Sequence, residues 1–453
     1  MQFAKRGDRW LLAATAVAAL SALLWFGLTM GDTASAAAGH GKRSAGLTHR
    51  GGHNSQARRH HGHGQRARGH RARGAHPASI TSVPWGTANG QAVRLYTLDS
   101  GNGMTVHITN YGGVVQSIWV PGRTGQPADV ALGFPKLSDY VNDVQNQPWP
   151  AAGGSGDTYF GGAIGRYANR IADHSFTLNG TTYQLVGNNG PNNVNTLHGG
   201  PDAWNTAVWS AQTRQDRGAV SLVLTHVDPD GYNGFPGQVT VTLTYTLTRH
   251  NALRENWSAT TTKPTVINVT SHIYFNLAGE GSGSVDNQLL QINSNTFQPT
   301  NAVQIPTGQF VPVAGTPFDF RHLHPIGQNI LRADLPWGGQ LTVAHGYDFN
   351  WVLNGSAGRM KEAALAVDPA SGREVTAYTT EPGLQVYTGN FLVGDLVGTS
   401  GHIYRQTSAF TLETQHYPDS PHHIGQANWP SVVLNPGQTF HSTTVYQFGV
   451  TRR

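Results

Sequence analysis

Apolar side chains and threonines alternate without a break from Val239 to Thr248. Successive side chains of a β-strand point to opposite faces, so this period of two gives one apolar face and one polar face. A strand of this kind packs on a core with one face only, which is typical of antiparallel sheets. The run therefore predicts a half-buried strand in an antiparallel sheet.

Turn signals recur along the rest of the chain. Asn179-Gly180 stands between two short strand-like runs, and this dipeptide is a strong signal for a tight hairpin. Residues 369–372 and 435–437 separate further pairs of such runs. The chain has 56 glycines and 24 prolines in 453 residues, which argues against a helical bundle. The sequence predicts an all-β fold, a single large antiparallel β-sandwich that spans residues 80–453.

The first 38 residues have the pattern of an export signal. Lys5, Arg6 and Arg9 precede an apolar run over residues 10–30, and small residues follow. The run is 21 residues long, enough to span a bilayer, so an uncleaved signal anchor is the alternative to a cleaved signal peptide. In either case we expect a secreted or extracytoplasmic protein, or one anchored in the membrane by residues 10–30.

Residues 39–79 form a basic segment rich in His, Arg and Gly. Residues 39–78 hold nine Lys or Arg, eight His and no acidic residue. Almost nothing apolar is available to offset the entropy of ordering, so we expect a disordered linker. Metal capture, or contact with an anionic cell wall or membrane surface, is the alternative to a merely solvated linker.

The remaining residues exclude several classes of protein. The chain has no cysteine, which rules out disulfide scaffolds, cysteine-ligated zinc and thiol catalysis. Residues 79–453 carry 18 basic and 23 acidic residues, so the formal net charge of +5 comes from the N-terminal segments. The predicted sandwich is mildly acidic, and we expect no nucleic-acid partner.

Three predicted strands have a polar face that combines imidazole, phenol, amide and carboxyl groups. These residues are His272, Tyr274 and Asn276 in the first, Gln385 and Tyr387 in the second, and Thr411, Glu413 and Gln415 in the third. Such a mixture suits a sugar, which offers many hydroxyls and an apolar ring face. Alternation alone leaves a structural role open, because a single His or Glu in a strand is more often structural or solvated than catalytic.

Two long motifs and six short ones follow one another along the chain. The long motifs are Gly161-Gly162-Ala163-Ile164-Gly165-Arg166-Tyr167-Ala168-Asn169-Arg170-Ile171 and Ser271-His272-Ile273-Tyr274-Phe275-Asn276-Leu277. The short ones cover residues 110–113, 197–200, 230–237, 346–348, 385–389 and 413–415. Together, and in this order, they resemble the aldose 1-epimerase (galactose mutarotase) family over nearly all of residues 80–453.

The resemblance implies a galactose mutarotase-like supersandwich and an isomerase. Such an enzyme interconverts the α and β anomers of free aldohexoses such as glucose or galactose. Matching positions make His272 the general acid and Glu413 the general base. The implied sugar-binding residues are Asn169, Arg170, His198, Tyr274, Asp348 and Gln385. The chain departs from the family at Phe349, where His is frequent, and after Pro418, where Asp-Ser replaces Asp-Ala; both put the preferred sugar in question.

The chemistry of this reaction suits an imidazole and a carboxyl group. A base removes the proton of the anomeric hydroxyl, an acid protonates the ring oxygen, and the two exchange roles when the ring closes. No hydride moves and no covalent intermediate forms, so we expect neither cofactor nor metal. A non-catalytic extracellular carbohydrate-binding protein of the same fold is the alternative, and a glycoside hydrolase would need two carboxyl groups across the bond.

Overall fold

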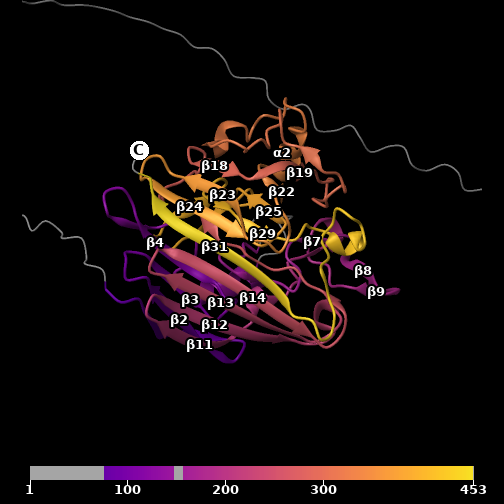
Figure 1. Cartoon of the computed structure of the whole chain (residues 1–453), viewed down its shortest axis with the longest axis horizontal. Coiled ribbons are helices and arrows are strands. Elements are labelled where there is room, and N and C mark those ends of the chain that lie inside the picture. The colour runs from indigo at the N-terminus through magenta and orange to yellow at the C-terminus, as the bar shows by residue number, and fades with distance from the viewer. Residues whose placement is uncertain (1–75, 147–156, 452–453) are drawn as a thin grey trace, which may run out of the picture. The chain divides into compact units, whose positions relative to one another are not determined.

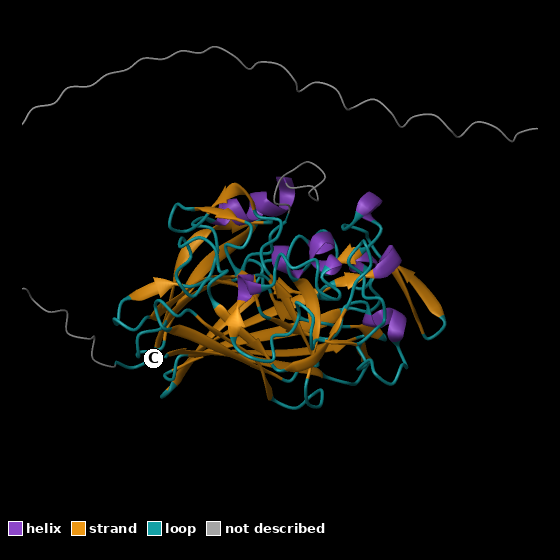
Figure 2. Ribbon diagram, turned by 90° about the horizontal axis from the view of Figure 1, so that it is seen from above, coloured by secondary structure: helices purple, strands orange, loops and turns teal. Residues whose placement is uncertain are grey.

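Antiparallel strands make up most of the described chain, which comprises residues 76–146 and 157–451 of a computed structural model (Figure 1). The described part has two α-helices, α1 (Leu137–Asn146) and α2 (Gly339–Ala344). In Figure 2 the long strands lie together on one side of the domain, and the helices and many loops lie on the other. The predicted antiparallel all-β fold is confirmed.

The predicted export signal, residues 1–38, and residues 39–75 of the predicted linker lie outside the described residues. Within the described ranges, no helix combines the length and the apolar character that crossing a membrane requires. All described residues belong to a single compact unit.

The largest sheet has nine strands. Their spatial order is β11 (Ser210–Asp216), β12 (Ala219–Asp228), β13 (Val239–Thr248), β14 (Ala252–Thr261), β31 (Phe440–Val450), β24 (Arg373–Thr379), β23 (Lys361–Val367), β18 (Leu289–Ile292) and β21 (His324–Pro325). Strand β13 is the alternating run, and its five apolar side chains are all 0% exposed while its threonines are half-buried. The prediction of a half-buried antiparallel strand is therefore confirmed.

Two five-stranded sheets pack on the large sheet. One runs β1 (Ser79–Ala88), β2 (Gln91–Asp99), β3 (Thr105–Thr109), β4 (Val115–Pro121), β5 (Pro127–Asp129). The other runs β20 (Val311–Pro312), β19 (Ser294–Gln298), β22 (Asp348–Leu353), β25 (Gly383–Tyr387), β29 (Glu413–Gln415). Buried residues such as Ile118, Leu243 and Trp351, one from each sheet, belong to a single hydrophobic core.

Short strands and turns complete the domain. The strand pairs are β6 (Ala163–Ile164) with β16 (Thr270–Ser271), β7 (Arg170–Ile171) with β10 (Thr196–Leu197), β8 (Ser175–Leu178) with β9 (Thr181–Gln184), β15 (Thr265–Val266) with β30 (Val433–Leu434), β17 (Tyr274–Phe275) with β28 (Phe410–Thr411), and β26 (Val393–Val397) with β27 (Ile403–Arg405). The 3-10 turns are η2 (Ala172–His174), η3 (Pro191–Asn193), η4 (Trp204–Thr206), η5 (Tyr232–Gly234), η6 (Ile326–Gln328) and η7 (Ser420–His423).

The predicted turns are present, with one difference in the strands that they join. Asn179-Gly180 closes the β8–β9 hairpin with both residues at positive φ, as a tight hairpin turn requires. Residues 369–372 connect the paired strands β23 and β24. The turn at 435–437 instead connects strands of different sheets, because β30 pairs with β15 and β31 pairs with β14 and β24.

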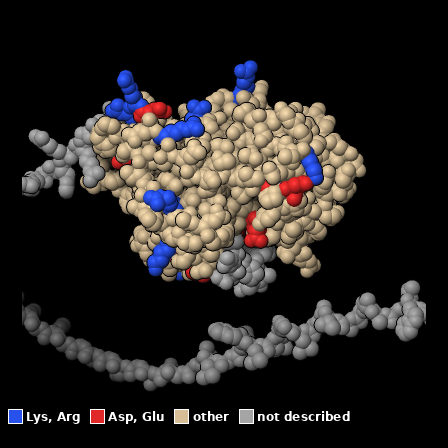
Figure 3. Space-filling model, turned by 90° about the horizontal axis from the view of Figure 1, so that it is seen from below, with Lys and Arg blue, Asp and Glu red and all other residues tan. Residues whose placement is uncertain are grey.

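Charged side chains are sparse on the surface. Only 12% of the chain is charged, and on the face in Figure 3 the Lys, Arg, Asp and Glu side chains are scattered among uncharged residues. A nucleic-acid backbone requires a continuous basic patch or stripe, and this face does not offer one.

The domain begins slightly before the predicted boundary at residue 80. The carbonyl of the buried Ala78 accepts a hydrogen bond from the Gln215 side chain (2.9 Å), and the His76 amide donates to the carbonyl of Gly101 (3.1 Å). These contacts tie residues 76–78 to the rest of the domain.

We therefore predict that a protein beginning at His76 unfolds cooperatively, with a Tm within about 2 °C of that of the full chain. Thermal unfolding followed by circular dichroism measures this. A protein beginning at Val83 is the control, because it loses the pairing of residues 79–82 with β2 and should melt at a lower temperature. Loss of cooperative unfolding in the His76 protein would show that the preceding residues belong to the fold.

Candidate active site

The eight residues predicted for the site lie together, although they come from six separate segments of the chain. They are Asn169, Arg170, His198, His272, Tyr274, Asp348, Gln385 and Glu413, each between 1% and 8% exposed. Hydrogen bonds, ion pairs and ring contacts connect all of them into one cluster. Their roles remain predictions, but the structure brings the predicted set together.

His272 and Glu413 face each other at the centre of this cluster. His272 Nε2 lies 3.6 Å from Glu413 Oε1, and that oxygen also accepts a hydrogen bond from the Thr411 hydroxyl (2.8 Å). Glu413 begins β29 and pairs directly with Gln385 of β25. The two groups are thus close enough to act on one small molecule.

The backbone of His272 is held by the glycines that open the first long motif. The Gly161 amide donates to the carbonyl of His272, and the His272 amide donates to the carbonyl of Gly162, both at 2.9 Å. Gly161 has φ +64°, and a Cβ there would lie 2.1 Å from the carbonyl oxygen of Val115. Only glycine fits this position, which explains why the motif matters for His272.

The strand prediction around His272 is wrong in one respect. Residues 269–276 do not form one strand, because β16 and β17 are separated at His272 and pair with different partners, β6 and β28. Likewise β28 and β29 are separated at Leu412. None of residues 269–276 is more than 5% exposed, so alternation of polarity could not separate a core face from a site face.

Burial shifts the pKa values of the pair in opposite directions. It raises the pKa of Glu413 to about 8, only partly offset by the hydrogen bond from Thr411. It lowers the pKa of His272 to about 3. Both shifts favour the neutral form, so burial favours a protonated Glu413 carboxyl group beside a neutral His272 imidazole.

His198 is fixed as a hydrogen-bond donor. Its Nδ1 accepts the backbone N–H of Asn169 (3.1 Å), so in the neutral ring the proton is on Nε2. Burial, followed by the neighbouring His272 and Arg170, lowers the pKa of His198 well below its usual value. A neutral ring with its Nε2–H free suits donation to a sugar hydroxyl.

His198, His272 and Glu413 offer ligand atoms within 4.8 Å of one another, a spacing that a metal ion could use. Ligation through His198 Nε2 would require the proton on Nδ1, which already faces the Asn169 N–H. Two N–H groups would then oppose each other. The donor chemistry of these residues fits a metal poorly.

Asp348 and Arg170 form the charged part of the site. Arg170 Nη2 lies 3.6 Å from Asp348 Oδ2, and Arg170 Nε donates to the Asn189 side chain (3.0 Å). Asp348 Oδ1 accepts from the Gln385 amide at 2.7 Å. Each group keeps further hydrogen-bonding capacity for a polyhydroxylated ligand.

Tyr274 packs on His272, with ring centroids 5.0 Å apart, and its hydroxyl donates to the carbonyl of Thr158 (2.8 Å). Its polar atom is therefore used within the protein. Asn276 likewise donates to the carbonyls of Gly283 and Ser408, so its amide N–H groups are used within the protein.

Two residues beside the cluster were not predicted. The half-buried Tyr159 places its ring 4.6 Å from that of His198 and 5.7 Å from that of His272. Gln304 bonds to both Arg170 and Asp348. Tyr159 lies two residues before the first long motif, which could have revealed it, whereas nothing near Gln304 marks its role.

The two departures from the family pattern lie away from the sugar-binding groups. Phe349 is fully buried, and its ring contacts Phe318 (4.8 Å) in the hydrophobic core. Ser420, the residue that differs in the second departure, is 2% exposed, and its amide donates to the Tyr167 hydroxyl (3.0 Å) while its own hydroxyl donates to the carbonyl of Tyr417 (2.7 Å). Neither gives a physical reason for an altered sugar preference.

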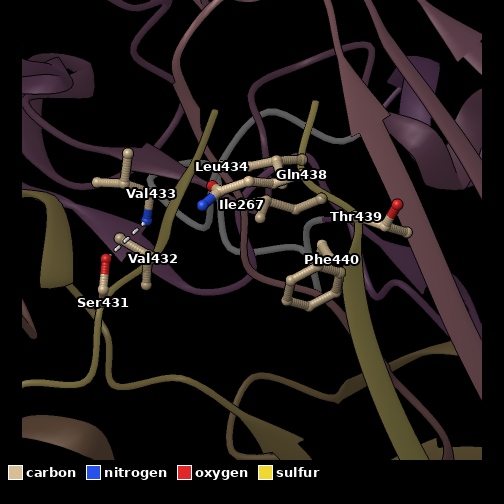
Figure 4. Close-up of a pocket in the computed structure, with 8 residues that line it drawn as sticks. All are labelled: Ile267, Ser431, Val432, Val433, Leu434, Gln438, Thr439 and Phe440. Carbon is tan, nitrogen blue, oxygen red and sulfur yellow. Dashed lines mark hydrogen bonds between the residues drawn. The ribbon is translucent and has the colours of Figure 1, made fainter. Parts of the chain in front are cut away.

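A separate pocket of about 450 Å³ lies elsewhere, lined by residues around β30 and the start of β31 (Figure 4). Its lining consists of Ile267, Ser431, Val432, Val433, Leu434, Gln438, Thr439 and Phe440. None of these side chains ionises near neutral pH and none belongs to the cluster around His272. This pocket therefore has no evident catalytic chemistry.

The cluster combines a buried acid–base pair with a guanidinium, a carboxylate and amides that have hydrogen-bonding capacity to spare. Together with the antiparallel sandwich, it defines an acid–base enzyme for a small molecule rich in hydroxyl groups. The family model described as "Aldose 1-epimerase" matches residues 94–447. The chain belongs to the aldose 1-epimerase family.

Individual members of this family are similar to the chain over most of its length. Galactose mutarotase of Rattus norvegicus is 37% identical over 82% of this chain and 99% of its own. Aldose 1-epimerase of Escherichia coli K12 is 34% identical over 80% of this chain and 96% of its own. The crystal structure of galactose 1-epimerase from Lactobacillus acidophilus superposes with a TM-score of 0.70 at 26% identity, covering 83% of this chain and 100% of that one.

The raised pKa of Glu413 predicts a stability effect. Between its usual pKa of 4.5 and the folded value of about 8, the unfolded chain ionises Glu413 while the folded protein keeps the proton. Stability is therefore lost as the pH rises through this window. Glu413→Gln cannot ionise, so its Tm relative to wild type should increase by about a few °C from pH 5 to pH 8.

Differential scanning calorimetry across this pH range measures the effect. Glu362→Gln, at an exposed position of β23, is the matched control and should show a constant difference from wild type. A constant difference for Glu413→Gln as well would mean that Glu413 is ionised in the folded protein throughout.

Proposed function

We propose that this protein is an aldose 1-epimerase that interconverts the α and β anomers of free aldohexoses such as glucose or galactose. The observation that carries the proposal is the buried His272–Glu413 pair, 3.6 Å apart, beside Arg170 and Asp348. Family membership and relatives named galactose mutarotase support it.

Ring opening needs one proton acceptor and one proton donor. Glu413, as base, takes the proton of the anomeric hydroxyl while the bond between C1 and the ring oxygen breaks. His272, as acid, protonates that oxygen, and C1 becomes an aldehyde. Rotation about C1–C2 and attack of the same hydroxyl on the other carbonyl face close the ring, and each group reverses its proton transfer. Nothing is oxidised or reduced.

The shared proton fits this cycle. The aldehyde stage has a protonated carboxyl and a neutral imidazole, the same state that burial favours in the sugar-free protein. The ring-closed stage needs the proton on His272, and hydrogen bonds from the sugar hydroxyls to Glu413 favour that transfer. In this cycle the proton is therefore on His272 while the sugar ring is closed and on Glu413 while the ring is open.

The surrounding groups hold the sugar. The Nε2–H of His198 donates, Asp348 accepts, and Arg170 has guanidinium N–H groups beyond those bonded to Asn189 and Gln304. Tyr159 adds a half-buried ring next to both imidazoles, suited to the apolar face of a hexose.

We also propose that the protein works outside the cytoplasm. The support is the composition of the N-terminus, where a basic stretch and the apolar residues 10–30 have the form of an export signal or membrane anchor. Residues 39–79 then act as a basic linker that contacts anionic cell-wall polymer or the membrane surface.

His272→Asn and Glu413→Gln should each lower kcat by roughly 10²- to 10⁴-fold, the usual worth of one positioned proton-transfer group. Polarimetry on freshly dissolved α-D-glucose and α-D-galactose measures the rate. The double variant should lose far less than the product of the two single losses, since each group needs its partner. A Glu413→Gln variant with a rate near wild type would refute the assignment of the base, and Asp348 would be tested next.

The pH dependence of kcat/KM should be bell-shaped. The pair needs one proton, so activity should fall above about pH 8, where Glu413 loses it, and at low pH, where His272 gains a second. The burial-shifted pKa values thus assign the acidic limb to the imidazole and the basic limb to the carboxyl group, the reverse of what their usual pKa values give. In Glu413→Gln, the residual activity should lack the limb near pH 8.

The basic linker predicts salt-dependent adhesion. A protein beginning at residue 39 should be retained on an anionic polymer column in about 50 mM salt and released by about 500 mM, because the attraction of nine fixed cations is screened. The protein beginning at His76 is the control and should flow through. Retention that does not depend on the salt concentration would contradict an electrostatic contact.

A further inference from the structure

Gln304 stands between the two charged groups of the site. Its Oε1 accepts a hydrogen bond from Arg170 Nη2 (2.6 Å), and its Nε2 donates to Asp348 Oδ2 (2.8 Å). The partners fix the orientation of the amide, because a guanidinium only donates and a carboxylate only accepts. The amide is thus matched to a cation at one end and an anion at the other.

The backbone of Gln304 has an energetically unfavourable conformation. Gln304 has φ +61°, a left-handed conformation that favours glycine and costs other residues about 1 kcal/mol or more. The loop is closed by Asn301, whose amide donates to the carbonyl of Ile305 (2.8 Å) and whose carbonyl accepts from the Gln304 amide (3.0 Å). Asn301 Oδ1 also accepts from the amides of Val303 and Ile305. Unfavourable backbone conformations that neighbouring hydrogen bonds hold in place are often found at functional residues, so we infer that the Gln304 side chain has a functional role.

Gln304 and Gln385 hold the two oxygens of Asp348. One amide donates to Oδ2 and the other to Oδ1, at 2.8 and 2.7 Å. The carboxylate plane is therefore fixed, and each oxygen keeps lone-pair capacity for a ligand hydroxyl. Preorganisation of this kind lowers the entropic cost of binding.

Gln304 also keeps Arg170 from closing on Asp348. The two groups lie 3.6 Å apart with side chains less than a tenth exposed, and a guanidinium and a carboxylate left alone there favour a bidentate pair. Such a pair would use the hydrogen-bonding groups that the sugar requires. The neutral amide instead occupies one group on each and leaves the others available.

We propose that Gln304 is a positioning residue for sugar binding, which holds Asp348 and Arg170 apart and in the orientation that receives adjacent hydroxyls of the hexose. This inference rests on the proposed mutarotase function. It assigns to Gln304 an effect on KM rather than on the proton transfers, because Gln304 contacts neither His272 nor Glu413 through any hydrogen bond found among the described residues.

The first test is the near-isosteric Gln304→Met, which removes both polar contacts. KM should rise about tenfold or more, the usual effect of losing hydrogen bonds to charged groups, while kcat changes less than about threefold. Calorimetric binding of 1,5-anhydro-D-glucitol, a sugar that has no anomeric hydroxyl, should weaken in parallel. Gln309→Met, at an exposed position after the same loop, is the control and should behave as wild type.

Three further variants separate positioning from a structural role. Gln304→Gly and Gln304→Ala lose the same two contacts, so KM should rise in both, but only glycine relieves the left-handed backbone, so the Gly variant should have the higher Tm of the two. In Gln304→Glu, the new carboxyl faces Arg170 and Asp348. Protonated, it donates to Asp348 as the amide does, and ionised, it repels it; the ratio of its KM to that of wild type should therefore grow with pH. A role in folding alone would give no such pH dependence.

A double-mutant cycle completes the test. In an Asp348→Asn background, Gln304→Met should have a much smaller effect on KM, because the group that it positions is altered. Wild-type KM and analogue binding in Gln304→Met would overturn the inference while leaving the proposed function intact. A wild-type protein that neither speeds mutarotation nor binds the analogue would overturn the proposed function, and this inference with it.

Discussion

The small sheet that carries Asp348, Gln385 and Glu413 is buried on both faces, and the two faces differ in polarity. Phe349, Trp351, Leu384 and Val386 belong to the hydrophobic core, whereas Asp348 and Gln385, at alternate positions of the same strands, bond to each other in the site. Strand alternation alone produces this division, since neighbouring side chains leave opposite faces. The same backbone hydrogen bonds therefore support the core and align the carboxyl and amide groups of the site.

Burying so many polar groups is tolerable only because they bond to one another. Asp348 is met by two amides and Arg170 by Asn189 and Gln304, and Asp419 secures the backbone of Arg170. An unpartnered buried group of this kind would cost about 1–3 kcal/mol. Some buried atoms among the described residues still have no partner, including Gln385 Oε1, Asn189 Nδ2 and Glu413 Oε2. At Glu413 and His272 the mutual contact is also long, and burial opposes the charge of each. Large burial-induced pKa shifts thus occur at the two groups to which the proposed mechanism assigns the proton transfers.

Much of the fold and of the site could be predicted from the sequence, for identifiable reasons. Period-two alternation predicted the faces of β13 and β25, because in each strand the side chains facing the core are apolar and polar side chains lie on the opposite face. It failed at residues 269–276, which are buried all round and broken into β16 and β17 at His272. The eight site residues were predicted through motif resemblance. Gln304 escaped prediction because a loop residue at positive φ leaves no periodic trace, and its partners are distant in the sequence.

In the proposed mechanism His272 and Glu413 share a single proton, which has a consequence for how the site can be enclosed. Each turnover ends with the pair in the protonation state in which it began, whichever anomer leaves, so no proton has to arrive from the solvent or be returned to it. A reaction that supplies its own proton does not need a water channel, and the His272 and Glu413 side chains can remain almost fully covered.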